Sequence, residues 1–229
     1  MKRLALCALA CACAFAPSAQ AEDAIAAAES LVRARYYEGL PYEDARALAV
    51  EAVPRLAEML RDPGEVPHHA NIVMALGISG HPEGAAALLA FAQTPPRGSV
   101  DAAGFNAQLA LRLALGHQAA GDDRALAWLE SAGRAGPPEP GWSYRSQRGE
   151  RLARLLRRTA LRGLAISGRP EAADRLRTEL FPSDAVPPES RDPELSRHAA
   201  DWLALHARVA RLGPDGAFAS RAAPRRSTR

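Results

Sequence analysis

An internal repeat is the feature that most constrains what this chain can fold into. The segment Gly77–Ala85 (GISGHPEGA) returns 88 positions later as Ala165–Ala173 (AISGRPEAA), and Ile, Ser, Gly, Pro, Glu and Ala recur in place. A weaker copy lies between them, with its Gly121 41 residues after Gly80 and 47 before Gly168. One unit is therefore about 44 residues long, and self-similarity at such a period is typical of stacked repeat architectures.

Each copy has the chemistry of a turn between two helices. Gly80 and Gly168 follow apolar segments, and glycine tolerates the left-handed conformation that stops a helix. Pro82 and Pro170 stand where a first helical turn accepts proline, and the Glu after each suits the positive end of a new helix. We therefore predict a helix, a tight turn and a second, antiparallel helix in each unit. No run of residues alternates apolar and polar, so strands are predicted to be absent.

Helical periodicity extends along most of the chain. Helices are expected at 23–37, 42–52, 54–61, 68–79, 82–93, 103–118, 122–133, 147–167, 170–180 and 193–211. Segments rich in proline and glycine separate some of them, at 95–98, 135–141 and 182–193. The connection at 135–147 is expected to be a hinge or an exposed loop. Residues 213–229 are expected to form a disordered, Arg-rich tail.

The repeated units resemble the HEAT-repeat family, a group of armadillo-like α-solenoids. The segment Val53–Asp62 (VPRLAEMLRD) looks like the second helix of a HEAT unit, and Ala-Leu-Gly at 75–77 and 114–116 looks like the end of the first. The resemblance covers about residues 42–180. It implies an all-α fold, an α-solenoid of about four to five HEAT-like helical pairs, with the second helices lining a concave face. Stacking must bury the apolar helices, so Leu88, Leu126 and Leu164 are expected at the interfaces.

The first 21 residues have the pattern of a secretory signal peptide. Met1–Arg3 is positively charged, Leu4–Ala16 is apolar, and Ala19-Gln20-Ala21 offers the small residues of a cleavage site. The apolar stretch is too short to span a membrane, and a lipoprotein site at Cys11 is the less favoured alternative. We expect cleavage after Ala21, which leaves a HEAT-repeat domain at 22–212 in the periplasm of a bacterium or secreted, with no transmembrane segment. Lys2 is the only lysine beside many arginines, which is typical of a GC-rich bacterial genome.

The sequence offers little for catalysis or for metal binding. The cysteines, Cys7, Cys11 and Cys13, all lie in the expected signal peptide, and no His-Glu-x-x-His or Gly-x-Ser-x-Gly pattern is present. Ser79 and Ser167 recur at equivalent repeat positions, which favours a shared structural role over a catalytic one. We therefore expect no catalytic residues, no cofactor and no metal. Some HEAT-repeat proteins are lyases or hydroxylases, but the His-Glu dipeptides of the iron-binding hydroxylases do not occur here.

An arginine stripe is the strongest functional candidate. It comprises Arg148, Arg151, Arg154, Arg158 and Arg162, which fall within about 120° of arc on one helix. Guanidinium groups bind carboxylates and phosphates in bidentate fashion. The alternative is a solvated face that Glu150, Glu171 and Glu179 partly neutralise. Nucleic acid is not expected as a partner, because the chain is predicted to be exported and the part before the tail is slightly acidic.

Aromatic residues form two further groups. Trp142 and Tyr144 lie in the long connection, where they would either anchor a partner or hold the loop against the stack. Tyr36, Tyr37 and Tyr42 are expected to cap the exposed end of the stack. Trp128 and Trp202 stand at apolar helix positions and are expected in the core.

These observations favour an exported, non-enzymatic scaffold that binds another protein, preferably an acidic one, through the concave face or the arginine stripe. One alternative is a binder of anionic envelope lipid or polysaccharide that uses the same arginines. In addition, the Arg-rich tail would allow peripheral contact with the envelope. An enzyme accessory or lyase-like HEAT protein is the less favoured reading.

Overall fold

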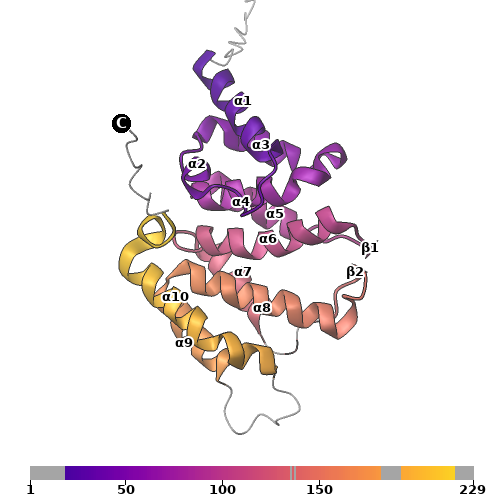
Figure 1. The fold of residues 1–229 in the computed structure, drawn as a ribbon, viewed down its shortest axis with the longest axis vertical. Helices are drawn as coiled ribbons and strands as arrows, with labels where there is room; N and C mark the ends of the chain where they lie inside the picture. Colours follow the sequence, from indigo (N-terminus) through magenta and orange to yellow (C-terminus); the bar gives the residue numbers. More distant parts are fainter. Residues whose placement is uncertain (1–18, 135, 137, 182–191, 220–229) are drawn as a thin grey trace, which may run out of the picture.

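The computed structural model describes residues 19–134, 136, 138–181 and 192–219, and this part of the chain is mostly helical (Figure 1). The all-α class is therefore confirmed. The α-helices are α1 (Ala19–Arg33), α2 (Tyr42–Arg46), α3 (Val53–Met59), α4 (His69–Ser79), α5 (Pro82–Ala92), α6 (Ala102–Gln118), α7 (Asp123–Gly133), α8 (Gly149–Ser167), α9 (Pro170–Leu180) and α10 (Pro193–Phe218). Two 3₁₀ helices, η1 (Val50–Ala52) and η2 (Pro63–His68), precede α3 and α4.

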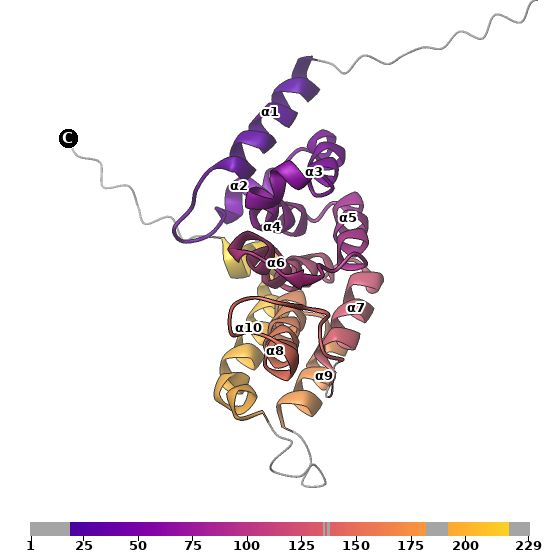
Figure 2. The ribbon, with the colours of Figure 1, turned by 90° about the vertical axis from the view of Figure 1, so that its right-hand side faces the viewer.

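Three helical hairpins form the centre of the molecule: α4 with α5, α6 with α7, and α8 with α9. The first helices α4, α6 and α8 pack side by side in chain order, and α5, α7 and α9 follow one another along one side of them (Figure 2). Helix α10 packs against α8 and α9 and runs back along the molecule, so that its end reaches α2 (Figure 1). The fold thus has two helical layers and a final helix that returns along them.

The turns of the two strong repeat copies have the predicted geometry. Gly80 and Gly168 adopt left-handed conformations, with φ of 74° and 61°, and Pro82 and Pro170 begin the next helices. The equivalent serines make the same hydrogen bond near the helix end: Ser79 Oγ donates to the carbonyl of Leu76, and Ser167 Oγ donates to that of Leu164. Their shared structural role is therefore confirmed.

The middle copy makes its turn differently. Gly121 is not among the residues with positive φ, and the Asp122 side chain caps α7 by accepting from the backbone N–H groups of Arg124 and Ala125. An aspartate at the N-cap satisfies free amides of the helix start, whereas the equivalent His81 and Arg169 make no side-chain cap bond. The weaker sequence match thus reflects a different capping chemistry.

The first helices cross so closely that only glycine fits at the contacts. A Cβ on Gly116 would lie 2.5 Å from the carbonyl oxygen of Gly163, and one on Gly77 would lie 2.5 Å from Cα of Ala114. Apolar side chains from α1 to α10 fill the remaining space as one continuous core. Leu88, Leu126 and Leu164 are buried in it, as predicted.

The predicted tryptophans also belong to the core. Trp202 is buried, and Trp128 is partly buried against the same cluster. By contrast, Tyr37 is fully exposed (104%), so the prediction that it caps the end of the stack is wrong. Tyr36 instead donates from its hydroxyl to the carbonyl of Leu31, which is 3.0 Å away.

Several predicted boundaries need correction. The expected absence of strands is wrong, because β1 (Gly98–Ser99) and β2 (Trp142–Ser143) form a short parallel pair that joins two loops. The helix expected at 42–52 is interrupted after α2, and α1 ends at Arg33, four residues before its predicted end.

The carboxyl-terminal boundary differs as well. Helix α10 bends at Gly213 (φ 70°, ψ 168°) and continues to Phe218, so the first part of the expected tail is helical. Pro214 accounts for the continuation, since it suits the first turn of a helix after a break. Residues 220–229 of the expected tail and residues 1–18 of the expected signal peptide lie outside the described residues. Among the described helices, none is long and apolar enough to cross a membrane.

Candidate functional site

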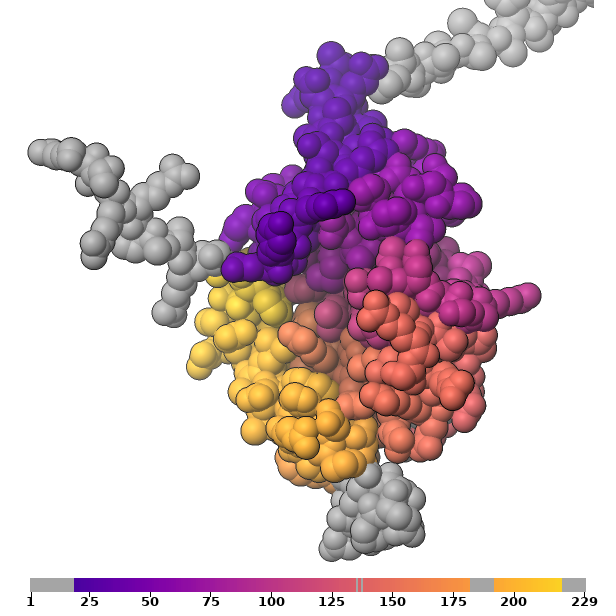
Figure 3. Space-filling view, turned by 45° about the vertical axis from the view of Figure 1, so that its right-hand side comes forward, coloured from indigo at the N-terminus to yellow at the C-terminus, as the bar shows by residue number. Residues whose placement is uncertain are grey.

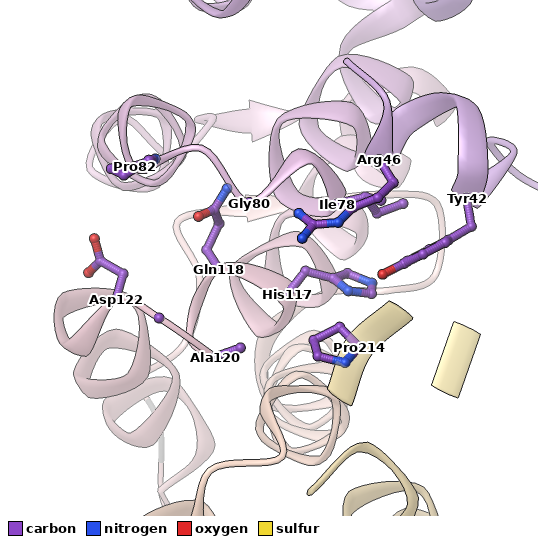
Figure 4. A pocket seen from close by; sticks show the side chains of 11 residues that line it. Tyr42, Arg46, Ile78, Gly80, Pro82, His117, Gln118, Ala120, Asp122 and Pro214 are labelled. Carbon is purple, nitrogen blue, oxygen red and sulfur yellow. The ribbon is translucent and has the colours of Figure 1, made fainter. Parts of the chain in front are cut away.

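A polar pocket of about 340 Å³ opens where the helices turn, on the side to which α10 returns (Figure 4). It is lined by Tyr42 and Arg46 of α2, Ile78, Gly80 and Pro82 of the α4–α5 turn, His117, Gln118, Ala120, Gly121 and Asp122 of the α6–α7 turn, and Pro214 of α10. Four segments distant in sequence therefore converge on it. The pocket combines a guanidinium group, an imidazole ring, a phenol and an amide.

Two of these groups hold the end of α10. Tyr42 Oη donates to Asp215 Oδ1 over 2.9 Å, and Arg46 Nε lies 2.8 Å from the same oxygen. The Phe218 ring lies 5.7 Å from the Tyr42 ring and 5.0 Å from the His117 ring, centroid to centroid. Burial and the nearby Asp215 carboxylate raise the pKa of the Tyr42 hydroxyl far above its usual range, so it stays a proton donor.

His117 is the electrostatically unusual residue of the pocket. Burial, aided by the positive charge of Arg46, lowers the pKa of its imidazole to about 4. Its Nδ1 is buried and has no hydrogen-bond partner among the described residues. The ring is therefore neutral at pH 7 and retains hydrogen-bonding capacity next to the pocket.

Other polar groups of the pocket are tied to the backbone. Arg46 Nη1 donates to the carbonyl of Ser79 over 2.6 Å, and Gln118 Nε2 donates to the carbonyl of Leu76 over 2.6 Å. Both carbonyls belong to the last turn of α4, where the helix backbone supplies no N–H donors for them. A Cβ on Gly80 would lie 2.6 Å from Arg46 Nη1, so the hydrogen bond from Arg46 to the Ser79 carbonyl also requires glycine at position 80. These side chains thus serve the helix end as well as the pocket.

A second hollow is an apolar groove between α3 and α5, of about 650 Å³. We call it the α3/α5 groove; it is lined by Ala57, Leu60, Arg61, Glu83, Ala87, Ala90, Phe91 and Thr94. Alanines make up much of its wall, and small residues let another helix approach closely. Arg61 and Glu83 provide one charge of each sign.

The arginine stripe is only partly available. Arg158 pairs with Glu194 (2.7 Å) and Asp192 (3.5 Å) at the start of α10, and Arg154 pairs with Glu150 (3.1 Å). Arg148, Arg151 and Arg162 are exposed and have no ion-pair partner among the described residues. Three stripe arginines, Arg151, Arg154 and Arg158, line a pocket of about 550 Å³ together with the two acids of α10.

The acids that neutralise the stripe are mostly not those expected. Glu150 pairs with it as predicted, but Glu179 binds Arg157 and Arg175, and Glu171 binds Arg169. The acids of α10 were missed because they follow a long connection in the sequence. Only the packing of α10 on α8 brings them to the stripe.

Trp142 does not serve as an exposed anchor. Its side chain is buried (5%) against Phe105, Leu152 and Leu156, while Tyr144 stacks on Phe105 with ring centroids 4.4 Å apart. Pairing of β2 with β1 holds this part of the connection to the loop after α5. Of the two expected alternatives, the loop held against the stack is therefore the one observed, and Trp142 is not exposed as a partner anchor.

Two buried arginines were not singled out from the sequence. Arg157 donates to Glu179 and to the carbonyl of Gly133, with its side chain only 10% exposed. Arg112 lies over the Trp128 ring at 5.5 Å, and burial lowers its pKa to about 10. Within the described ranges, no cluster of three or more His, Cys, Asp or Glu residues is arranged to hold a metal ion.

Comparisons of the chain with protein-family models, with curated proteins and with solved structures found no match.

Proposed function

We propose that the chain is an exported, non-enzymatic scaffold of HEAT-like helical pairs that binds another protein in the α3/α5 groove. The observation that carries this proposal is the groove itself, which is apolar, about 650 Å³ in volume, and lies on the layer of second helices. Surfaces of this kind accept the apolar face of a helix. The layered hairpins and the repeat of about 44 residues support the HEAT-like architecture.

The lining of the groove defines the occupant. Ala57, Ala87 and Ala90 favour a closely packed helix, and Leu60 and Phe91 favour apolar side chains on its inner face. Arg61 and Glu83 favour an acidic and a basic residue at the matching positions of that helix. We therefore propose an amphipathic helix of a partner protein, with an apolar stripe and flanking charges.

The non-enzymatic part of the proposal rests on the polar pocket. Its guanidinium and amide groups bind the carbonyls of α4, and its phenol binds Asp215. Groups engaged in this way stabilise the helix ends, and a reaction would need some of them to be released.

The test uses two alanines of the same helix. Ala90 lines the groove, whereas Ala86 is also exposed on α5 but is not part of the lining. Ala90→Glu places a charge in the apolar contact and is expected to weaken partner binding by about tenfold or more. Ala86→Glu is expected to leave it unchanged.

The measurement starts with affinity purification from envelope extract with the wild-type chain and both variants. A protein captured by wild type and Ala86→Glu but lost with Ala90→Glu is then purified, and its Kd for each chain is measured by calorimetry. Equal Kd values for the three chains, or no protein captured by any of them, would contradict the proposal.

A second candidate is a binder of anionic lipid or polysaccharide, which the three unpaired arginines of the stripe favour. Reversing the charge of Arg148, Arg151 and Arg162 together is expected to abolish binding to vesicles with anionic headgroups. Unaltered binding would remove this candidate.

A further inference from the structure

The last turn of α10 occupies a binding surface made by residues from the other end of the fold. Asp215 accepts from Tyr42 and Arg46, and Phe218 packs against the Tyr42 and His117 rings. Phe218 stands three positions after Asp215, so one helical turn presents both side chains on the same face. In the space-filling view, the end of α10 (yellow) lies against the amino-terminal part (indigo) (Figure 3).

A break in the helix at Gly213 connects this last turn to the rest of α10. Gly213 breaks the helix with φ 70° and ψ 168°, and a Cβ built on it would meet nothing within 4 Å. The Asp215 side chain is 61% exposed and that of Arg46 is 43% exposed. An ion pair so open to water contributes little to stability. The segment Pro214–Phe218 can therefore swing away without disturbing the core.

Part of the polar pocket lies next to the docked turn and is not filled by it. The polar pocket continues past Pro214 to Gln118 and Asp122, which lie on the side of His117 away from Tyr42 (Figure 4). His117 also lines this pocket, and its Nδ1 is buried without a hydrogen-bond partner among the described residues. An occupant larger than Pro214–Phe218 would gain contacts that the chain's own segment does not make.

We propose that Tyr42, Arg46 and His117 form a receptor for a helical turn that carries an acidic residue and, three residues later, an aromatic residue, and that a partner protein with this turn displaces Pro214–Phe218. The carboxylate binds the phenol and the guanidinium, and the aromatic ring packs on the two rings. This receptor is separate from the α3/α5 groove and adds a second partner surface to the scaffold.

The test uses a fluorescein-labelled peptide with the sequence of residues 211–219 (RLGPDGAFA) and full-length chains. In the wild-type chain the attached segment competes with the peptide at high effective concentration. The double variant Asp215→Asn with Phe218→Ala removes this competition, so it is expected to bind the peptide about tenfold more tightly or better by fluorescence anisotropy. A peptide with the same two substitutions is expected not to bind.

Matched tyrosines identify the receptor. Tyr42→Phe in the double variant removes one donor to the carboxylate and is expected to weaken peptide binding several-fold, while Tyr37→Phe, at a fully exposed tyrosine, is expected to have no effect. Ala90→Glu is expected to leave peptide binding unchanged, which separates this proposal from that of the α3/α5 groove. Far-UV circular dichroism confirms that each variant is folded; if the double variant is not, Asp215→Asn alone replaces it.

Hydrogen exchange gives an independent measurement on the wild-type chain. The amides of residues 217–219 are expected to exchange much faster than that of the buried Val209, because the turn opens locally at Gly213. Equal exchange rates, no peptide binding to the double variant, or equal effects of the Tyr42 and Tyr37 substitutions would overturn the proposal. A concentration-dependent dimer that the double variant abolishes would also overturn it, because the occupant would then be a second copy of the chain.

Discussion

At the scale of single residues, His117 shows how packing changes chemistry. Its ring packs against the Tyr42 and Phe218 rings, and burial, aided by the Arg46 charge, lowers its pKa to about 4. The sequence predicted nothing for this histidine, because its neighbours come from α2 and from the end of α10. A residue with an ordinary local context thus becomes a neutral buried imidazole only in the folded chain.

This pKa makes stability depend on pH. The unfolded chain binds a proton at His117 near pH 6.5, whereas the folded chain binds it only near pH 4. Neutral His117 therefore adds to the free energy of unfolding above pH 6.5. This contribution, on the order of 3 kcal/mol, is lost as the pH falls to about 4. Urea unfolding at several pH values is expected to show a steeper loss for wild type than for His117→Gln. Parallel curves for the two chains would contradict this prediction.

At the scale of elements, the turn residues predicted the two outer hairpins well. Gly80 with Pro82, and Gly168 with Pro170, act locally, so the boundaries of α5 and α9 follow from a few neighbouring residues. The β1–β2 pair could not be predicted in this way, because its parallel contact joins loops more than forty residues apart and depends on the burial of Trp142. Neighbouring residues thus determine the helix boundaries at these turns, whereas tertiary packing determines the β1–β2 pair.

The close crossing of α6 and α8 gives a prediction at this scale. A Cβ on Gly116 would lie 2.5 Å from the Gly163 carbonyl oxygen, so Gly116→Ala must push the two helices apart. We expect a loss of about 2–3 kcal/mol in the free energy of unfolding, measured by urea titration. Gly121→Ala is the control, since its Cβ would meet nothing within 4 Å and its φ is not positive. A similar loss for both variants would show that the crossing is not the cause.

At the scale of the whole molecule, α10 completes two of the candidate surfaces, the arginine stripe and the polar pocket. Its start brings Asp192 and Glu194 to the arginine stripe, and its end closes the polar pocket at α2. The sequence predicted this helix but not the direction in which it packs along the other helices, because no pattern in the long connection before it indicates that direction. The stripe, whose acidic partners on α10 the sequence did not predict, and the pocket, which it did not predict at all, are therefore both sites that α10 completes.

The stacked arrangement predicts that damage to one hairpin stays partly local. Leu164 is fully buried where α8 meets the core, and an aspartate there would place a charge among apolar side chains. We expect Leu164→Asp to cost at least about 4 kcal/mol and to unfold α8, α9 and α10, because each repeat contacts mainly its neighbours. Hydrogen exchange is then expected to show lost protection in these helices and retained protection in α4 and α5.

The exposed Leu212 provides the matched control, since Leu212→Asp introduces the same charge outside the core. That variant is expected to keep the wild-type melting temperature and circular dichroism. If Leu164→Asp also kept both, Leu164 would not be an interface residue. If it instead unfolded α4 and α5 together with α8, the continuous core would act as one cooperative unit, and the hairpins would not be separable repeats.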